Sequence, residues 1–118
     1  MIAPLEKDEQ IAVVAYCKLR SIPISASMNG VFLNSKNANR YINSLKKQGM
    51  ALGFPDIFIP MPNKTHAGLF IEMKRRKGGV VSDNQNKWIK ILNDAGYYAV
   101  VCWGFDEARK VIDEYLQN

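Results

Sequence analysis

The sequence predicts an α/β domain in which helices flank a small mixed β-sheet. Two patterns support this prediction: residues 55–60 and 68–74 alternate as paired strands do, and residues 68–103 follow the order strand, helix, strand. A helical crossover joins parallel strands, whereas the short 61–67 connection joins antiparallel ones, so the sheet would be mixed. With 118 residues, of which 47% are hydrophobic and 23% charged, residues 1–118 have the size and composition of one globular domain.

The first predicted element is a helix over residues 6–20, which begins just after Pro4. Its apolar side chains recur at helical spacing, and we expect these to face the core: Ile11, Val14, Ala15 and Leu19. Residues 21–34 follow as an extended stretch with a turn at Asn29-Gly30.

A short basic helix is predicted over residues 38–48. Ile42 and Leu45 lie one turn apart and would face inward. Gly49 and Gly53 would end the helix, because glycine readily adopts the backbone conformation found at helix C-termini.

The hairpin predicted over residues 55–74 brings two acidic side chains together. Successive side chains of a strand point to opposite faces. In the first strand Asp56 therefore points to the face away from Ile57 and Ile59, and in the second strand Glu72 and Lys74 share one face. Antiparallel pairing of the two strands would set Asp56 beside Glu72.

A helix over residues 82–95 is predicted from its start signal and its periodicity. Ser82 and Gln85 have the Ser-x-x-Gln form of a capping box, and Gly96 ends the helix. The residues expected to face inward are Trp88, Ile91, Leu92 and Ala95. The apolar run 97–103 then predicts a strand covered on both faces, with Trp103 as a core residue.

A last helix is expected after Gly104, running through residue 116. Asp106 is the expected N-cap, because an aspartate side chain can accept hydrogen bonds from the first backbone N–H groups of a helix. The residues expected to face the core are Ala108, Val111, Ile112, Tyr115 and Leu116.

Positive charge is concentrated in the middle of the chain. The whole sequence has a formal charge of +5 and a pI near 9.3, but residues 10–82 hold eleven basic side chains and only two acidic ones, Asp56 and Glu72. One interpretation is a solvated face of lysines. Solvated faces usually mix both signs, so the near absence of acids favours a surface that contacts phosphates.

Other classes of site find no support in the sequence. No run approaches the roughly 18 apolar residues of a membrane span, and the first ten residues carry charges where a signal peptide is apolar, so we expect a cytoplasmic protein without a membrane partner. Cys17 and Cys102 fit buried thiols, and His66 alone cannot complete a Cys/His zinc cluster. Gly78-Gly79 lacks the Lys and Ser/Thr of a P-loop, which argues against a nucleotide cofactor.

The two isolated acids suggest phosphodiester hydrolysis. Mg²⁺ is typically held by one or two carboxylates plus substrate phosphate, and it lowers the pKa of bound water. Asp56 and Glu72 suit that role, and Lys74 can orient the attacking water or stabilise the developing charge. Structural roles stay open as alternatives: a turn position for Asp56, and a surface ion pair for Glu72 with Lys74.

Together these residues resemble the Pro-Asp…Glu-x-Lys signature of the PD-(D/E)XK nucleases. The complete ordered set is similar to the VRR-NUC branch, particularly its small standalone members of phage type. The motifs that carry the resemblance are Gly53-x-Pro55-Asp56, Ile71-Glu72-Met73-Lys74, Ser82-x-x-Gln85, Gly96-Tyr97 and Gly104-Phe105. The resemblance covers about residues 6–112 and implies a restriction-endonuclease-like core of αβββαβ order.

The resemblance implies the following catalytic residues: Asp56, Glu72, Lys74, Gln85 and Glu9. Asp56 and Glu72 match the metal-binding acids, and family members supply a further acid from the first helix. Glu9 is the match for that acid, with Glu6 one turn earlier as a competitor. For Gln85 the capping box is an equally good structural explanation.

The implied activity is endonucleolytic cleavage of DNA that depends on Mg²⁺ or Mn²⁺. The standalone members look like dimeric Holliday junction resolvases, so we expect branched or four-way DNA as the partner, and a homodimer, in a bacterial or phage-infected cell. The residues expected to bind nucleic acid are Lys36, Arg40, Lys46, Lys47, Arg76 and Lys77. Two alternatives stay open: a non-catalytic DNA-binding scaffold, and a nuclease with flap or RNA substrates inside a larger complex.

Overall fold

The computed structural model describes residues 3–27 and 38–118, so the expected turn at Asn29-Gly30 and the basic residue Lys36 lie outside the described residues. In chain order the elements are α1 (Glu6–Leu19), β1 (Ser25–Ala26), α2 (Ala38–Lys47), β2 (Ile57–Ile59), β3 (Leu69–Lys74), α3 (Asp83–Asp94), β4 (Tyr98–Trp103) and α4 (Phe105–Gln117). The predicted order of helices and strands is confirmed.

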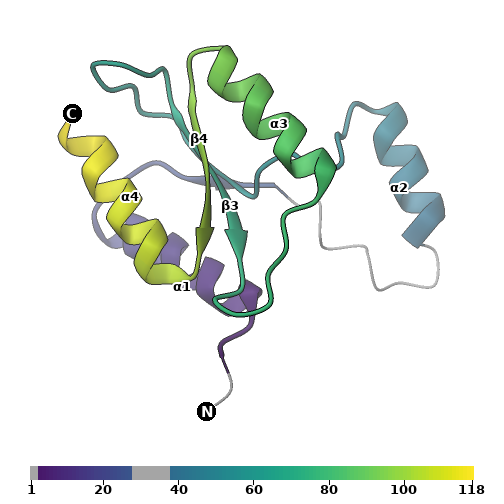
Figure 1. Cartoon of the computed structure of the whole chain (residues 1–118), viewed down its shortest axis with the longest axis horizontal. Coiled ribbons are helices and arrows are strands. Elements are labelled where there is room, and N and C mark those ends of the chain that lie inside the picture. The colour runs from purple at the N-terminus through teal and green to yellow at the C-terminus, as the bar shows by residue number, and fades with distance from the viewer. Residues whose placement is uncertain (1–2, 28–37) are drawn as a thin grey trace.

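Four strands of the described chain form one mixed sheet in the order β1-β2-β3-β4. β2 pairs antiparallel with both β1 and β3, whereas β3 and β4 are parallel. The pairing of Ile57 with Ile71 sets position 56 opposite position 72, as the hairpin prediction requires. Helices α1 and α4 pack on one face of the sheet, and α3 covers the other (Figure 1).

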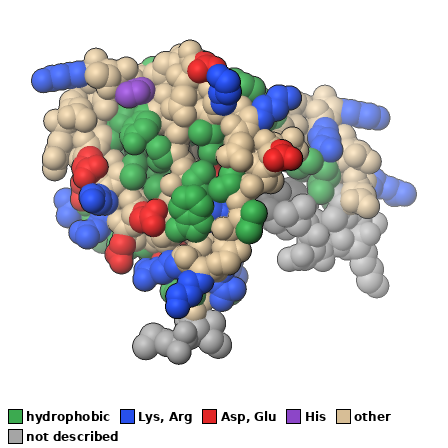
Figure 2. Space-filling view, in the orientation of Figure 1, with side chains coloured by type: hydrophobic (Ala, Val, Ile, Leu, Met, Phe, Trp, Pro, Cys, Tyr) green, Lys and Arg blue, Asp and Glu red, His purple; other side chains and the backbone are tan. Residues whose placement is uncertain are grey.

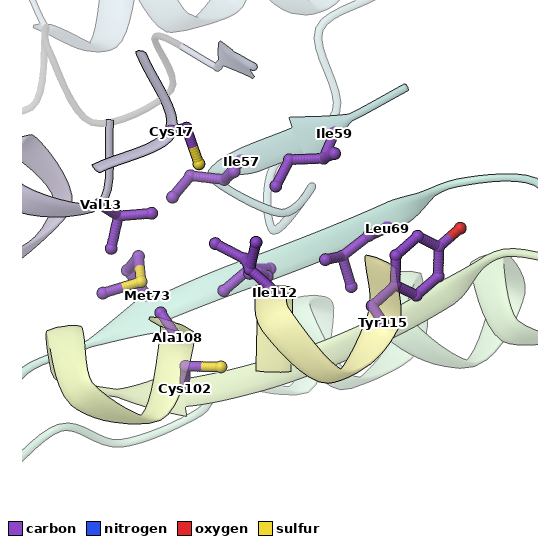
Figure 3. Close-up of a cluster of buried hydrophobic side chains, with 11 residues drawn as sticks. Val13, Cys17, Ile57, Ile59, Leu69, Met73, Cys102, Ala108, Ile112 and Tyr115 are labelled. Carbon is purple, nitrogen blue, oxygen red and sulfur yellow. The ribbon is translucent and has the colours of Figure 1, made fainter. Parts of the chain in front are cut away.

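The larger core lies between the sheet and the α1–α4 pair (Figure 3). It consists of Val13, Cys17, Ile57, Ile59, Leu69, Ile71, Met73, Cys102, Ala108, Ile112 and Tyr115. The inward face predicted for α4 is confirmed, with Val111 and Leu116 at the edge of this core. Both cysteines are buried free thiols, as expected.

The inward face predicted for α1 is wrong. Ile11 and Leu19 are 59% and 87% exposed, whereas the buried residues of the helix are Glu9, Val13 and Cys17. These three follow one another at intervals of four, so they form one side of the helix. The helix is turned this way because Glu9 makes buried polar contacts with the start of α4, which a count of apolar positions does not detect.

The start of α3 agrees with the predicted capping box. The Ser82 hydroxyl accepts a hydrogen bond from the Gln85 N–H (3.2 Å), and the Gln85 side-chain oxygen accepts one from the Ser82 N–H (2.8 Å). Leu92 is buried as expected, but Ile91 is exposed and Ile89 packs inward in its place. The buried stripe is narrow because α3 packs mainly on β4, the edge strand of the sheet.

The N-cap of α4 is Gly104 rather than the expected Asp106, because the helix begins directly after β4. Gly104 has a φ of +92°, and a Cβ atom there would lie 2.6 Å from Cγ of Arg76, so only glycine fits this turn. The Phe105 N–H at the start of the helix is bound by the carboxylate of Glu9 (3.0 Å). An acid from α1 therefore fills the role predicted for Asp106.

Helix α2 stands at the side of the molecule in Figure 1. Ile42 and Leu45 are half-buried, in agreement with the predicted inward positions, and the basic side chains of the helix are exposed. Across residues 3–27 and 38–118, no helix has the length and hydropathy needed to cross a bilayer.

Candidate active site

Three carboxylates from separate segments meet beside the sheet. Asp56 immediately precedes β2, Glu72 lies within β3, and Glu6 is the first residue of α1. One carboxylate oxygen of each residue lies within 4.8 Å of those of the other two. The hairpin register explains the pairing of Asp56 with Glu72, whereas Glu6 joins them only because α1 packs against β3.

The main chain of neighbouring strands holds Asp56 in place. Its Oδ2 accepts a hydrogen bond from the Met73 N–H (2.8 Å), and its backbone carbonyl accepts one from the Ser27 N–H (2.7 Å). Gly53, three residues earlier, has a φ of +86°, and a Cβ there would lie 2.6 Å from the backbone of Asn84. The Gly-x-Pro-Asp sequence therefore brings the turn before β2 against the start of α3 and orients the carboxylate before any ligand binds.

Glu72 is the most deeply buried acid of the cluster, at 2% exposure. Its Oε2 accepts a hydrogen bond from Nε2 of Gln85 (3.1 Å) and lies 3.8 Å from Nζ of Lys74. Gln85 thus caps α3 through its side-chain oxygen and binds Glu72 through its side-chain nitrogen. A capping role and a role in the site are therefore compatible for this residue. The other oxygen, Oε1 of Glu72, is buried without a hydrogen-bond partner among the described residues.

The cluster is electrostatically unfavourable without an added cation. Burial, followed by the negative charge of Asp56, raises the pKa of Glu72 to about 9. Burial and the same neighbouring charge also raise the pKa of Glu6. Lys74 acts against both shifts but does not cancel them, so a full set of ionised carboxylates needs more positive charge than the described residues place beside it.

The donor atoms suit a hard divalent cation. All three candidate ligands are carboxylate oxygens, the donors preferred by Mg²⁺ and Mn²⁺, and no histidine or cysteine belongs to the cluster. The unpartnered Oε1 of Glu72 fits such an ion, because a buried carboxylate oxygen without a donor is costly unless a cation binds it.

The structure places Glu9, the expected acid of the first helix, outside this cluster. Glu9 is 3% exposed, and its Oε1 accepts hydrogen bonds from Nε of Arg76 (2.8 Å) and from the Phe105 N–H (3.0 Å). The competitor Glu6 is the residue that joins Asp56. Sequence spacing could not separate the two acids, because positions 6 and 9 lie one turn apart on the same side of a helix.

The predicted nucleic-acid-binding residues fall into two groups. Arg40, Lys46 and Lys47 are exposed on α2, where Figure 2 shows a concentration of basic side chains at the right of the molecule. Lys77 is also exposed, after the end of β3. Arg76 is exposed as well, but its guanidinium is paired with Glu9 and lies 3.9 Å from Asp106.

Comparison with known proteins agrees with the fold. The model of the VRR-NUC domain family matches residues 9–106. Among solved structures, a chain described as a VRR_NUC domain protein aligns with a TM-score of 0.82 and 25% sequence identity, over 99% of this chain and 92% of that one. The comparison with curated proteins finds no match.

Proposed function

This chain belongs to the VRR-NUC family of nuclease domains, and we propose that it is a metal-dependent endonuclease that cleaves branched DNA. The observation that carries the proposal is the cluster of Glu6, Asp56 and Glu72, in which a buried carboxylate oxygen has no partner within the described part of the chain. A family of nucleases makes DNA the expected partner, and the positive charge of the chain agrees with a polyanionic substrate.

The three acids would hold the metal, with Glu6 in the place expected for Glu9. A bound Mg²⁺ or Mn²⁺ would supply Lewis-acid chemistry, polarising the phosphoryl oxygen and lowering the pKa of a bound water. Lys74 would position the attacking water and stabilise the negative charge that develops on the phosphate, because it lies on the same face of β3 as Glu72. Gln85 would keep the Glu72 carboxylate oriented through the hydrogen bond from Nε2.

The proposal includes a branched DNA substrate and a homodimeric protein. Resemblance to small resolvase-like members of the family supports a four-way junction as substrate. Symmetric cleavage of a junction requires two active sites related by a two-fold axis, and residues 3–27 and 38–118 of one chain supply one such cluster. A stable monomer with full junction activity in analytical sedimentation would overturn the homodimer.

The substrate is tested by incubating the protein with labelled linear, flap, forked and four-way DNA in Mg²⁺, Mn²⁺ or EDTA. We expect cleavage of branched DNA in either metal and none in EDTA, because the acids cannot act without the cation. Equal cleavage of linear duplex would overturn the preference for branches, and activity in EDTA would overturn the metal requirement. An RNA flap in the same series tests whether RNA is the better substrate.

The assignment of the third ligand predicts different behaviour for Glu6 and Glu9 of α1. Glu6→Gln is expected to weaken Mn²⁺ binding about tenfold or more, since it removes a charged ligand, as measured by electron paramagnetic resonance titration. Glu9→Gln is expected to keep Mn²⁺ affinity within about threefold and to lower the melting temperature, because it removes the charge with which the buried Glu9 pairs with the partly exposed Arg76. Weakened Mn²⁺ binding in Glu9→Gln alone would instead place Glu9 in the metal site.

A further inference from the structure

The last residue of β4 lies beside the proposed catalytic lysine. β3 and β4 are parallel, and Trp103 is paired with Lys74 at the carboxyl ends of both strands. In α/β sheets ligands bind preferentially outside the carboxyl ends of parallel strands. Ala99 belongs to the core on the α3 face, and side chains alternate along a strand, so Trp103 shares that face with Glu72 and Lys74.

Trp103 is not the core residue that its apolar surroundings predict. It is 37% exposed and belongs to neither cluster of buried side chains. Trp88 differs, because it is half-buried and packs edge-on against Phe54 at a ring distance of 5.2 Å. The sheet therefore ends in a large exposed aromatic side chain next to the active site.

A hydrogen bond restrains the indole ring in this position. Its Nε1–H donates to the carbonyl oxygen of Gly79 (3.1 Å), in the loop between β3 and α3. That loop folds back over the end of β3, since a Cβ atom added to Gly79 would lie 3.0 Å from Cβ of Lys74. The same loop carries the exposed cation Lys77. An aromatic ring that is already restrained loses little side-chain freedom when a ligand stacks on it.

We propose that Trp103 stacks on an unpaired nucleobase of the substrate next to the scissile phosphate. The inference rests on the proposed nuclease function and deepens it by naming a determinant of substrate structure. Aromatic side chains at DNA-binding sites stack on bases that have left the duplex, whereas paired bases already stack on their neighbours. Trp103 would therefore favour DNA with unpaired nucleotides at the cleavage site, such as forks and opened junctions.

Two substitutions separate stacking from a purely structural role. Trp103→Phe keeps an aromatic face but loses the hydrogen bond to Gly79, whereas Trp103→Leu loses both. If the ring stacks on a base, Trp103→Leu weakens binding to forked DNA by about five- to 100-fold and leaves duplex affinity within about twofold. Trp103→Phe then stays within about threefold of the unsubstituted protein on both DNAs.

Affinities are measured by fluorescence anisotropy in EDTA, so that cleavage does not enter the measurement. A second measurement places 2-aminopurine at successive unpaired positions of the fork, and the unsubstituted protein is expected to quench at least one of them. Equal losses for Trp103→Phe and Trp103→Leu, or equal losses on fork and duplex, would overturn stacking, as would the absence of quenching at every position. The proposed nuclease function fails in a different experiment: if it is wrong, the unsubstituted protein does not cleave DNA in Mg²⁺, whatever the binding measurements give.

Discussion

Asp56→Asn is expected to reduce DNA cleavage about a thousandfold or more, because metal coordination supplies several kcal/mol of transition-state stabilisation and each 1.4 kcal/mol is a factor of about ten. Asparagine keeps an oxygen that can accept the hydrogen bond from the Met73 N–H, so the fold around the cluster should persist. Single-turnover rates on the best substrate, with excess protein in Mg²⁺ and in Mn²⁺, measure the loss.

DNA binding by Asp56→Asn is expected to stay within about threefold of the unsubstituted protein, because the substitution leaves the basic side chains in place. The matched control is Asp94→Asn, which removes an exposed carboxylate of α3 that pairs with Lys90, and its cleavage rate should not change. Unchanged cleavage by highly purified Asp56→Asn would contradict the catalytic assignment. Binding without cleavage by the unsubstituted protein would instead support the non-catalytic scaffold.

The stability of the metal-free protein is expected to fall as the pH rises from 6 to 8. Folding raises the pKa of Glu72 from its ordinary value of 4.5 to about 9, so between these values the folded chain retains a proton that the unfolded chain has released. The free energy of unfolding then decreases by up to about 1.4 kcal/mol per pH unit. The raised pKa of Glu6 acts in the same direction.

Urea denaturation at pH 6 and pH 8, in EDTA and in Mn²⁺, measures this effect. A divalent cation binds the ionised carboxylates, so Mn²⁺ should stabilise the protein more at pH 8 than at pH 6. Glu72→Gln removes the main titrating group and should show a flatter pH dependence in EDTA. Burial raises the pKa of Cys102 to about 12, so that thiol contributes only above this range. Metal-free stability that increases toward pH 8, or an equal slope in Glu72→Gln, would contradict the prediction.

The parts of the site that depend on local spacing were predictable from the sequence. Alternation within the hairpin is set by the two-residue period of a strand, and this places Asp56 beside Glu72 and Lys74 on the Glu72 face. The capping box between Ser82 and Gln85 is equally local, since its two hydrogen bonds join residues three positions apart. The contact of Gln85 with Glu72 is not local, and the resemblance to the family implied only that Gln85 belongs to the site.

The parts that depend on the rotation of helices were not predictable from apolar periodicity. α1 buries Glu9 and exposes Ile11, because a buried glutamate can be stabilised by a guanidinium and a backbone N–H. The same rotation directs Glu6 to the carboxylate cluster. The rotation also pairs Glu9 with Arg76, although the position of Arg76 in the basic run 74–77 predicts a contact with phosphate.

The sequence by itself determined the order of elements, the pairing of the two acids across the hairpin and the start of α3, because each follows from contacts between residues close in the chain. Only the tertiary structure decided which acid of α1 completes the cluster, what caps α4 and where Trp103 lies. Those features join groups up to 96 positions apart, such as the carboxylate of Glu9 and the backbone N–H of Phe105. Their geometry depends on how whole elements pack, and no local repeat in the sequence encodes it.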